Sequence, residues 1–255
     1  MKMLQKRAGR ATAWCLLLMV VLCLSDAPAV AGDLKAASAA TEKQRLAQYN
    51  QLLDQADNER KLQNLPASLA LYDRAEKLFP RDTSTFIARA DIYKEMGKMD
   101  RAISEIEKAL RLTPADLSLM QRFGEYSDVC GQLEKALACY DRVLASKPHD
   151  ASLLRRKAVA LKRLKRPLPA AQFFQKAYEA NKTSRDSHMN LHDAGQMYLL
   201  ANDTSEAMAC FELLIKTNPQ LSTGYWDRAQ VYDLKKEKTK AAADRAKARK
   251  LDLDY

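Results

Sequence analysis

The sequence predicts an all-α solenoid built from about six helix-turn-helix repeats. Three observations carry this prediction: an alanine-rich and glycine-poor composition, helical periodicity without long gaps, and a pattern that recurs every 34 residues. The 255-residue chain has 40 alanines but only 7 glycines and 8 prolines, which favours helices over sheets with many tight turns. A hydrophobic content of 47% with 29% charged residues is typical of an ordered globular protein.

The amino terminus carries the pattern of an export signal. Four basic residues lie among the first ten, an apolar stretch follows from 11 to 24, and residues 29–31 form an A-x-A cleavage site. Because this stretch is shorter than the roughly 20 residues that span a bilayer, we expect a signal peptide (1–31) cleaved after Ala31. A lipid anchor on Cys23 is not expected, since Leu22 stands where a lipoprotein signal has a small residue. We therefore expect a periplasmic or secreted protein.

Residues 32–48 are predicted to form a tether and the start of the first helix. The segment from 32 to 40 is small and polar, as in a linker. Thr41 and Gln44 then have the spacing of a capping box, which marks the beginning of many helices. We therefore expect the helical part of the chain to begin at Thr41.

A pattern with a period of 34 residues occupies residues 49–255. In its clearest copy, Phe86 and Ala90 share one face of a first helix, Gly97 marks a turn, and a second helix ends before Pro114. Small residues recur at the position of Ala90, which lets two helices approach closely around larger side chains. One helix pair cannot bury both faces alone, so neighbouring pairs must stack. The predicted copies are 49–82, 83–116, 117–150, 151–187, 188–221 and 222–255, of which the fifth needs three extra residues to align.

The fourth and last copies depart from this pattern. In the fourth, Lys157 replaces an apolar residue, Lys165 replaces the turn glycine, and Pro167 and Pro169 lie in the turn. Either the helix pair is bent there or its surface is specialised for binding. The last copy has Arg245 where others have an aromatic residue, as expected for the solvent-exposed end of a solenoid.

The pattern resembles the tetratricopeptide repeat family, whose motif combines W-x2-L-G-x2-Y, A-x3-F and a closing proline. The resemblance covers residues 49–255. It implies a right-handed superhelix whose first helices line a concave groove for peptides or partner proteins. Trp226 would then be either an aromatic anchor for the partner or a packing residue of the last repeat. The groove residues that the family geometry implies are Ile87, Asp91, Gln121, Glu125, Arg155, Val159, His192, Gln196, Trp226 and Gln230.

Seven basic residues crowd onto the first helix and turn of the fourth copy, with no acidic residue among them. Such a run repels itself unless something anionic faces it. It is either a solvated face or a site for an acidic protein segment, an anionic envelope polymer or a lipid head group. Nucleic acid is not expected, because the run lacks interleaved aromatic residues for base stacking. The seven residues are Arg155, Arg156, Lys157, Lys162, Arg163, Lys165 and Arg166.

The sequence indicates no enzyme and no cofactor. It contains no nucleophile elbow, zinc-protease motif, phosphate loop or dinucleotide fingerprint. His188 and His192 are four residues apart on one helix and could share a metal ion, but no third ligand is spaced to join them, so no metal site is expected. Beyond the signal, Cys130, Cys139 and Cys210 form no C-x-x-C pair and are expected to be small apolar fillers, with at most one disulfide.

We therefore expect a non-catalytic interaction scaffold outside the cytoplasm. Resemblance to exported family members implies a role in assembling a cell-envelope complex, such as pilus, secretion, outer-membrane or polysaccharide machinery. The alternative is a binder of anionic polymer or membrane surface through the basic helix 155–166. Steep salt dependence of binding would favour this alternative.

Overall fold

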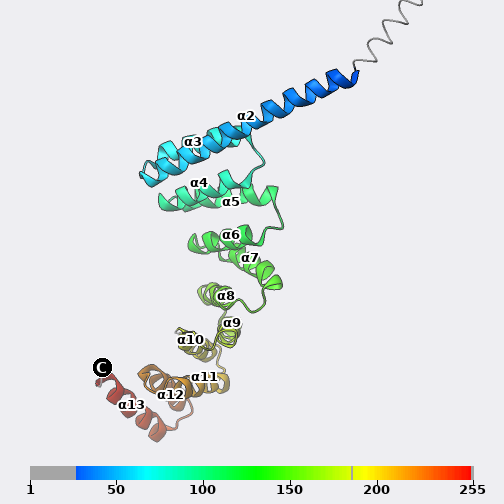
Figure 1. Cartoon of the computed structure of the whole chain (residues 1–255). Coiled ribbons are helices and arrows are strands. Elements are labelled where there is room, and N and C mark those ends of the chain that lie inside the picture. Colours follow the sequence, from blue (N-terminus) through cyan, green and yellow to red (C-terminus); the bar gives the residue numbers. More distant parts are fainter. Residues whose placement is uncertain (1–26, 185, 254–255) are drawn as a thin grey trace, which may run out of the picture. The chain divides into compact units, whose positions relative to one another are not determined.

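A computed structural model describes residues 27–184 and 186–253 of the chain. All regular secondary structure in these residues is helical and forms twelve helices (Figure 1), which confirms the predicted all-α solenoid. The predicted export signal lies almost wholly outside the described residues. Among the helices that are described, none is long and apolar enough to cross a membrane.

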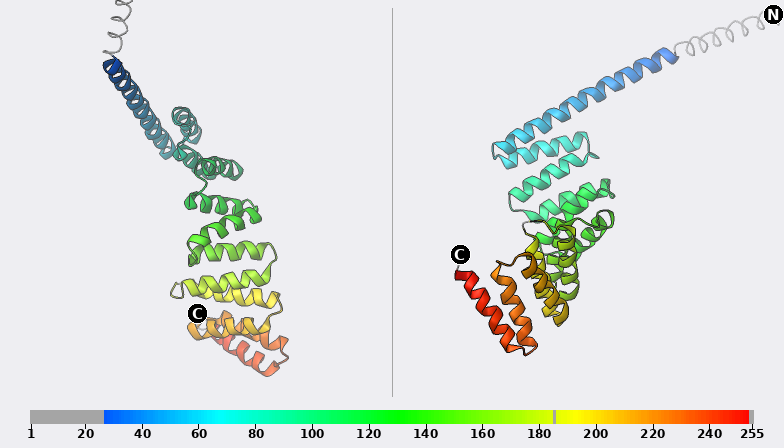
Figure 2. Two further views of the ribbon diagram at one scale, coloured as in Figure 1. Left: turned by 90° about the vertical axis from the view of Figure 1, so that its right-hand side faces the viewer. Right: turned by 60° about the horizontal axis from the view of Figure 1, so that its bottom comes forward.

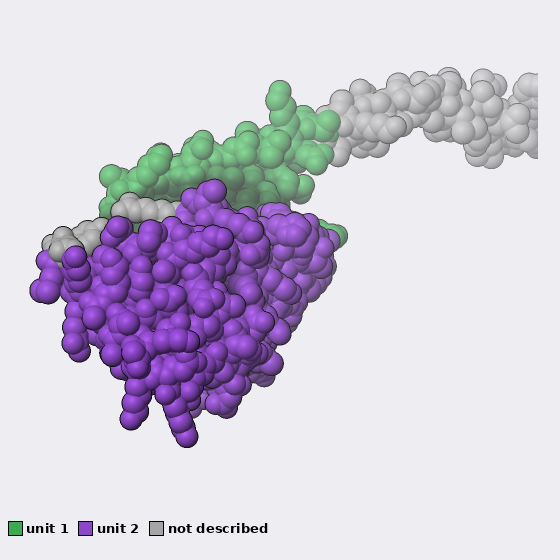
Figure 3. All heavy atoms as spheres, turned by 90° about the horizontal axis from the view of Figure 1, so that it is seen from below, with its two compact units in different colours: residues 1–85 green, residues 86–255 purple. Residues whose placement is uncertain are grey.

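The chain divides into two compact units, residues 1–85 and 86–255 (Figure 3). In the first unit, α2 (Ala27–Lys61) and α3 (Leu65–Leu78) form one helix pair. Tyr49 of α2 packs with Ala75 of α3, and its ring meets the ring of Phe79 edge-on at a centroid distance of 4.8 Å. The buried Ser68 hydroxyl donates a hydrogen bond to the carbonyl oxygen of Ala56 at 2.7 Å, which ties α3 to α2.

Helix α2 is described from Ala27 and continues without a break to Lys61. The predicted helix start at Thr41 is therefore wrong, and the segment expected to be a tether is helical. The physical reason is composition: four of the nine residues from 32 to 40 are alanine, the strongest helix former. The same small residues that suggest a linker also favour a continuous helix.

The second unit contains five successive helix pairs and begins within α4, at Phe86 (Figure 2). From the second of these pairs on, the first helix packs against the second helix of the pair before it, as α6 does on α5 and α12 on α11. The pairs are α4 (Thr83–Glu95) with α5 (Met99–Leu112), α6 (Leu117–Val129) with α7 (Leu133–Ser146), α8 (Ala151–Arg163) with α9 (Pro167–Ala180), α10 (Ser187–Leu200) with α11 (Thr204–Thr217), and α12 (Ser222–Leu234) with α13 (Lys238–Leu253).

Close approach within each pair depends on the small residue of the first helix. A β-carbon added at Gly124 would lie 2.9 Å from the Tyr140 ring, and one added at Gly195 would lie 2.3 Å from the Phe211 ring. Both aromatic side chains are fully buried. The recurring small residue thus leaves room for a large side chain of the second helix.

The turn within each pair contains one residue with a left-handed backbone. In the second unit these residues are Gly97, Gly131, Lys165, Asn202 and Lys236, with φ between 56° and 76°. Residues with a β-carbon adopt this conformation at a cost of roughly 1–2 kcal/mol, so glycine is favoured without being required.

The fourth copy therefore forms a regular helix pair. Lys165 takes the same left-handed conformation as the turn glycines, and Pro167 lies in the first turn of α9, where a missing N–H costs nothing. Helices α8 and α9 have 13 and 14 residues, the same lengths as α6 and α7. The substitutions that suggested a bend leave the helix lengths and the turn unchanged.

Candidate functional site

The first helices α4, α6, α8, α10 and α12 carry all ten residues predicted to line a groove. Nine of the ten are half-buried and Gln230 is exposed, so all of them reach the surface. Contacts between successive first helices decide which of these side chains are available to a partner.

Polar contacts join the earlier helices in series. Arg122 of α6 donates from Nη2 to both carboxylate oxygens of Asp91 on α4, at 2.7 and 3.0 Å. The Tyr126 hydroxyl donates to the same carboxylate at 3.0 Å. Arg156 Nε of α8 lies 3.5 Å from Glu125 Oε1 of α6. In both links the acid lies on the earlier helix and the base on the later one.

The order of charge reverses after α8. Arg155 Nη1 donates to Asn190 Oδ1 of α10 at 2.6 Å and lies 3.4 Å from Asp193 Oδ2. His192 of α10 then meets Asp227 of α12, with 2.6 Å between Nδ1 and Oδ2. Here the base lies on the earlier helix and the acid on the later one. Helix α8 thus supplies cationic groups to both of its neighbours.

The carboxylate of Asp227 holds His192 in place. The side chain of Asp227 is only 6% exposed, and Gln196 Nε2 donates to its second oxygen at 2.8 Å. The hydrogen bond with Asp227 raises the pKa of His192, against the opposing effect of burial. His192 therefore uses Nδ1 on Asp227 rather than on an ion shared with His188. Within residues 27–184 and 186–253, no group of three His, Cys, Asp or Glu side chains could hold a metal ion.

Six of the seven basic residues between 155 and 166 face acidic side chains of neighbouring helices. The seventh, Lys165, is the left-handed residue of the turn between α8 and α9. Besides the contacts of Arg155 and Arg156, the pairs are Lys157 with Asp141, Lys162 with Asp193 at 3.0 Å, Arg163 with Asp128, and Arg166 with Glu134 at 3.9 Å. The anionic groups that such a run requires are thus supplied by α6, α7 and α10 of the same chain.

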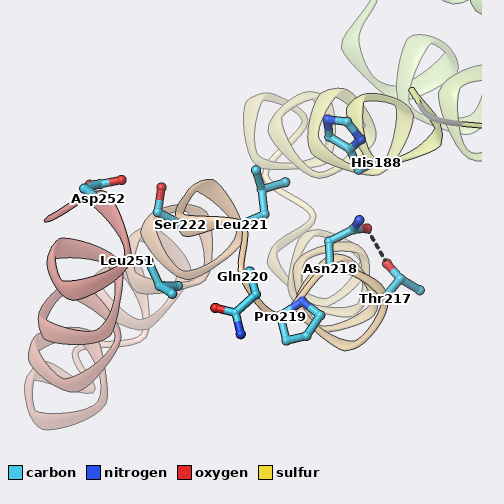
Figure 4. Close-up of a pocket in the computed structure, with 9 residues that line it drawn as sticks. All are labelled: His188, Thr217, Asn218, Pro219, Gln220, Leu221, Ser222, Leu251 and Asp252. Carbon is cyan, nitrogen blue, oxygen red and sulfur yellow. Dashed lines mark hydrogen bonds between the residues drawn. The ribbon is translucent and has the colours of Figure 1, made fainter. Parts of the chain in front are cut away.

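Three hollows adjoin one another along the N-terminal half of α10, and we call them together the trough. The first, of about 410 Å³, is lined by Arg155 and by the loop between α9 and α10. The second, of about 210 Å³, includes Met189, His192 and Leu221. The third, of about 650 Å³, lies between α10, the α11–α12 loop and the end of α13 (Figure 4). Met189 lines the first two hollows, while His188 and Leu221 line the last two, so neighbouring hollows share walls.

The trough includes only two of the ten predicted groove residues, Arg155 and His192. Asp91, Glu125 and Gln196 take part in contacts between first helices, and Gln121 Nε2 donates to Glu125 at 3.1 Å. Ile87 and Val159 pack at the edge of apolar clusters.

Trp226 belongs to the last repeat. Its Nε1 donates to Asp252 Oδ2 of α13 at 3.1 Å, which is a contact within the last repeat. The contact joins α12 to the final turn of the last helix.

Sequence reasoning misses most of the trough because it considers only the first helices. Met189 is 44% exposed and lies on the first helix α10, but outside the positions that the family geometry selects. Leu221 lies in a loop, and Asp252 lies in the last turn of a second helix. The exposed apolar residue one position after His188 is the signal in the sequence that could have indicated this site.

A family model described as tetratricopeptide repeat matches residues 19–190, and a second model with the same description matches residues 190–221. This chain belongs to the tetratricopeptide repeat family. Proteins of this family are generally non-catalytic scaffolds that bind protein or peptide partners. The tetratricopeptide repeat (TPR) assignment agrees with the helix pairs and their left-handed turns.

Several solved structures are similar to this TPR chain. They include MamA, at 18% identity and a TM-score of 0.59 over 67% of this chain and 92% of that chain. A TPR protein from Parabacteroides merdae has 20% identity and a TM-score of 0.58, with 78% and 77% covered. YrrB, described as a TPR protein with an unusual peptide-binding site, has 19% identity and a TM-score of 0.58, with 72% and 93% covered. At these identities the likeness shows the fold alone. No curated protein sequence matches the chain.

Proposed function

We propose that this TPR protein is a non-catalytic adaptor that holds an extended segment of a partner protein in the trough. The observation that carries the proposal is that three hollows with shared walls lie next to one another across α8, α10 and α12. Binding sites are typically concave, largely preformed, and lined by apolar surface with a few polar groups. Met189, Leu221 and Leu251 supply apolar surface, while Arg155 and Asp252 supply charge.

The side chains of the trough support binding rather than catalysis. His192 is paired with Asp227, and Asp193 with Arg155 and Lys162. A general base needs to face a nucleophile, and these pairs are ion pairs between helices instead. The three described cysteines are free thiols. Burial raises the pKa of Cys210 to about 12, so this thiol stays protonated near neutral pH.

We further propose that the protein acts outside the cytoplasm and helps to assemble a cell-envelope complex, such as a pilus, secretion, outer-membrane or polysaccharide machine. The basic head, apolar stretch and cleavage pattern of residues 1–31 support this location. Cell fractionation followed by N-terminal sequencing tests it. A mature protein that begins at Gly32 in the envelope fraction supports the proposal, and an intact N-terminus in the cytoplasm contradicts it.

In-cell crosslinking of the tagged full-length protein, followed by mass spectrometry, tests the adaptor role. The informative variant is Met189→Arg, which places a long charged side chain on the wall shared by two hollows. Leu200→Arg is the matched control, because Leu200 is also exposed and lies at the other end of the same helix. A protein partner that is lost in Met189→Arg and retained in Leu200→Arg supports the proposal.

Two other outcomes would contradict it. A partner retained equally by both variants would place the interaction outside the trough. Salt-sensitive retention on envelope lipid or polysaccharide, without a protein partner, would favour the alternative role of an anionic-surface binder. The internal acidic partners of the basic run favour the adaptor over that alternative.

A further inference from the structure

The third hollow of the trough has a distinct chemistry. Figure 4 shows its nine lining residues, which come from the start of α10, the end of α11, the α11–α12 loop, the start of α12 and the last turn of α13. Among these nine there is one carboxylate, that of Asp252, and no lysine or arginine. The hollow is therefore locally acidic in a chain with a formal net charge of +10.

A donor on α12 holds the carboxylate of Asp252 at the rim of the hollow. The indole Nε1 of Trp226 donates a hydrogen bond to it at 3.1 Å, and the Ser222 side chain also lines the hollow. The neighbouring side chains of Ser222 and Trp226 lower the pKa of Asp252, so the group is ionised at neutral pH. A carboxylate held by a donor of another helix is oriented before any ligand arrives.

The opposite side of the hollow also favours a cation. It is formed by the C-terminal end of α11, where the helix dipole is negative and the last carbonyl groups have no partner within the helix. Thr217 Oγ1 lies 2.9 Å from both the carbonyl oxygen of Leu213 and Asn218 Oδ1, and its one proton can be donated to either oxygen. The amide oxygens of Asn218 and Gln220 add acceptors on the same side.

Apolar side chains form the remaining walls of the hollow. Leu251 is 5% exposed, and Leu221 and Pro219 complete this surface. Lysine and arginine combine an apolar stem with a cationic head, and they commonly bury the stem while the head stays at a polar rim. The apolar walls of the hollow suit the stem of such a side chain, and the carboxylate at the rim suits its cationic head.

We propose that the third hollow binds a lysine or arginine side chain of the partner segment, with the aliphatic stem on Leu221 and Leu251 and the cationic head at Asp252. The inference rests on the proposed function, because it assigns the chemistry of one residue of the segment held in the trough. A net basic chain attracts acidic peptides by charge alone. Preference for a basic residue at one position would therefore be a signature of this hollow.

The experiment uses the full-length protein and immobilised peptides of about twelve residues, with blocked termini and varied sequence. Peptides that bind are resynthesised with each lysine or arginine replaced by norleucine, and dissociation constants are measured by fluorescence anisotropy. We expect one replacement to weaken binding about fivefold, the size of a partly exposed ion pair. In Asp252→Asn, the lysine and norleucine peptides should bind alike, because the asparagine oxygen still accepts from Trp226 but carries no charge.

Three further variants test the assignment to Asp252. Glu134→Gln is the matched control, since Glu134 is a 68% exposed carboxylate at the start of α7, away from the trough. It should keep the preference for lysine. Asp252→Glu should also keep it, whereas Asp252→Lys should reverse it in favour of a glutamate peptide. Thermal unfolding of each variant shows whether α13 remains folded, and a variant of unchanged stability makes the comparison valid.

The outcomes separate this inference from the proposed function. Peptides that bind without a lysine or arginine, or whose affinity is unchanged by norleucine or by Asp252→Asn, would overturn the inference and leave peptide binding intact. Failure of every peptide to bind the wild-type protein would overturn the proposed function as well.

Discussion

The ammonium group of Lys157 on α8 lies 3.8 Å from the centre of the Phe173 ring on α9. Lys157 also pairs with Asp141 of α7, and its side chain is only 12% exposed. The corresponding positions of two other helix pairs, also sixteen residues apart, hold ion pairs, which are Arg89 with Glu105 and Arg228 with Asp244. The cation that seemed out of place in the fourth repeat therefore stabilises the packing of that repeat.

Replacing Lys157 should destabilise the protein although the residue is charged. We expect Lys157→Ala to lower the free energy of unfolding by about 1–2 kcal/mol, because the contact with the Phe173 ring and the packing of the aliphatic stem are both lost. Lys162→Ala is the comparison, since its side chain is 45% exposed and its ion pair contributes less than about 1 kcal/mol. Urea unfolding measures both, and equal effects would contradict the assigned role of Lys157.

The stability of the folded protein should depend on both Arg89 and Glu105, which form a buried ion pair. Arg89→Met leaves a carboxylate that is 8% exposed with Lys108 as its remaining partner, and we expect a loss of about 3 kcal/mol. The third repeat has phenylalanine and cysteine at the equivalent positions, 123 and 139. The double variant Arg89→Phe with Glu105→Cys should therefore recover much of the stability, as measured by thermal unfolding.

The left-handed turn at Lys165 offers a stabilising substitution. We expect Lys165→Gly to raise the free energy of unfolding by about 1 kcal/mol, because glycine adopts a φ of 56° without the steric cost of a β-carbon. The reverse change at an equivalent turn, Gly97→Lys, should lower it by a similar amount. Denaturant midpoints of both variants check the prediction, and a loss of stability in Lys165→Gly would be inconsistent with it.

Stability should depend on the protonation of His192. Asp227 raises the pKa of this histidine in the folded protein, Asp193 raises it further, and Lys162 lowers it. Because the folded-state pKa lies above the unfolded value of about 6.5, the stabilisation by protonated His192 is fully present below about pH 6.5. It is lost as the pH rises through the folded-state pKa. Thermal unfolding from about pH 5.5 to 8 should show the wild-type advantage over His192→Gln shrinking as the pH rises, and a constant difference would contradict this.

Much of the local architecture could be predicted because the structure of each helix pair depends mainly on the residues of that pair. The period of 34 residues, the small residue of each first helix and the position of each turn depend on contacts inside one pair. The left-handed conformation at Gly97 and Gly131 follows from local geometry in this way. The start of α2 could not be predicted as well, because alanine and small polar residues suit a linker and a helix alike.

The sequence by itself determined the repeat, the family and the positions on each helix that reach the surface. Only the tertiary structure decided which charged side chains of different helix pairs contact each other. The 34-residue period gives the position of a residue within its repeat, but it does not say which residue of the neighbouring repeat that side chain contacts. The same repeat position is occupied by Arg122 and Arg156 in two helix pairs and by Asp193 and Asp227 in the next two. Each of these side chains contacts a side chain of opposite charge on the preceding first helix. The trough likewise unites α10, the α11–α12 loop and Asp252, which are far apart in the chain and adjacent only after the last two pairs have stacked.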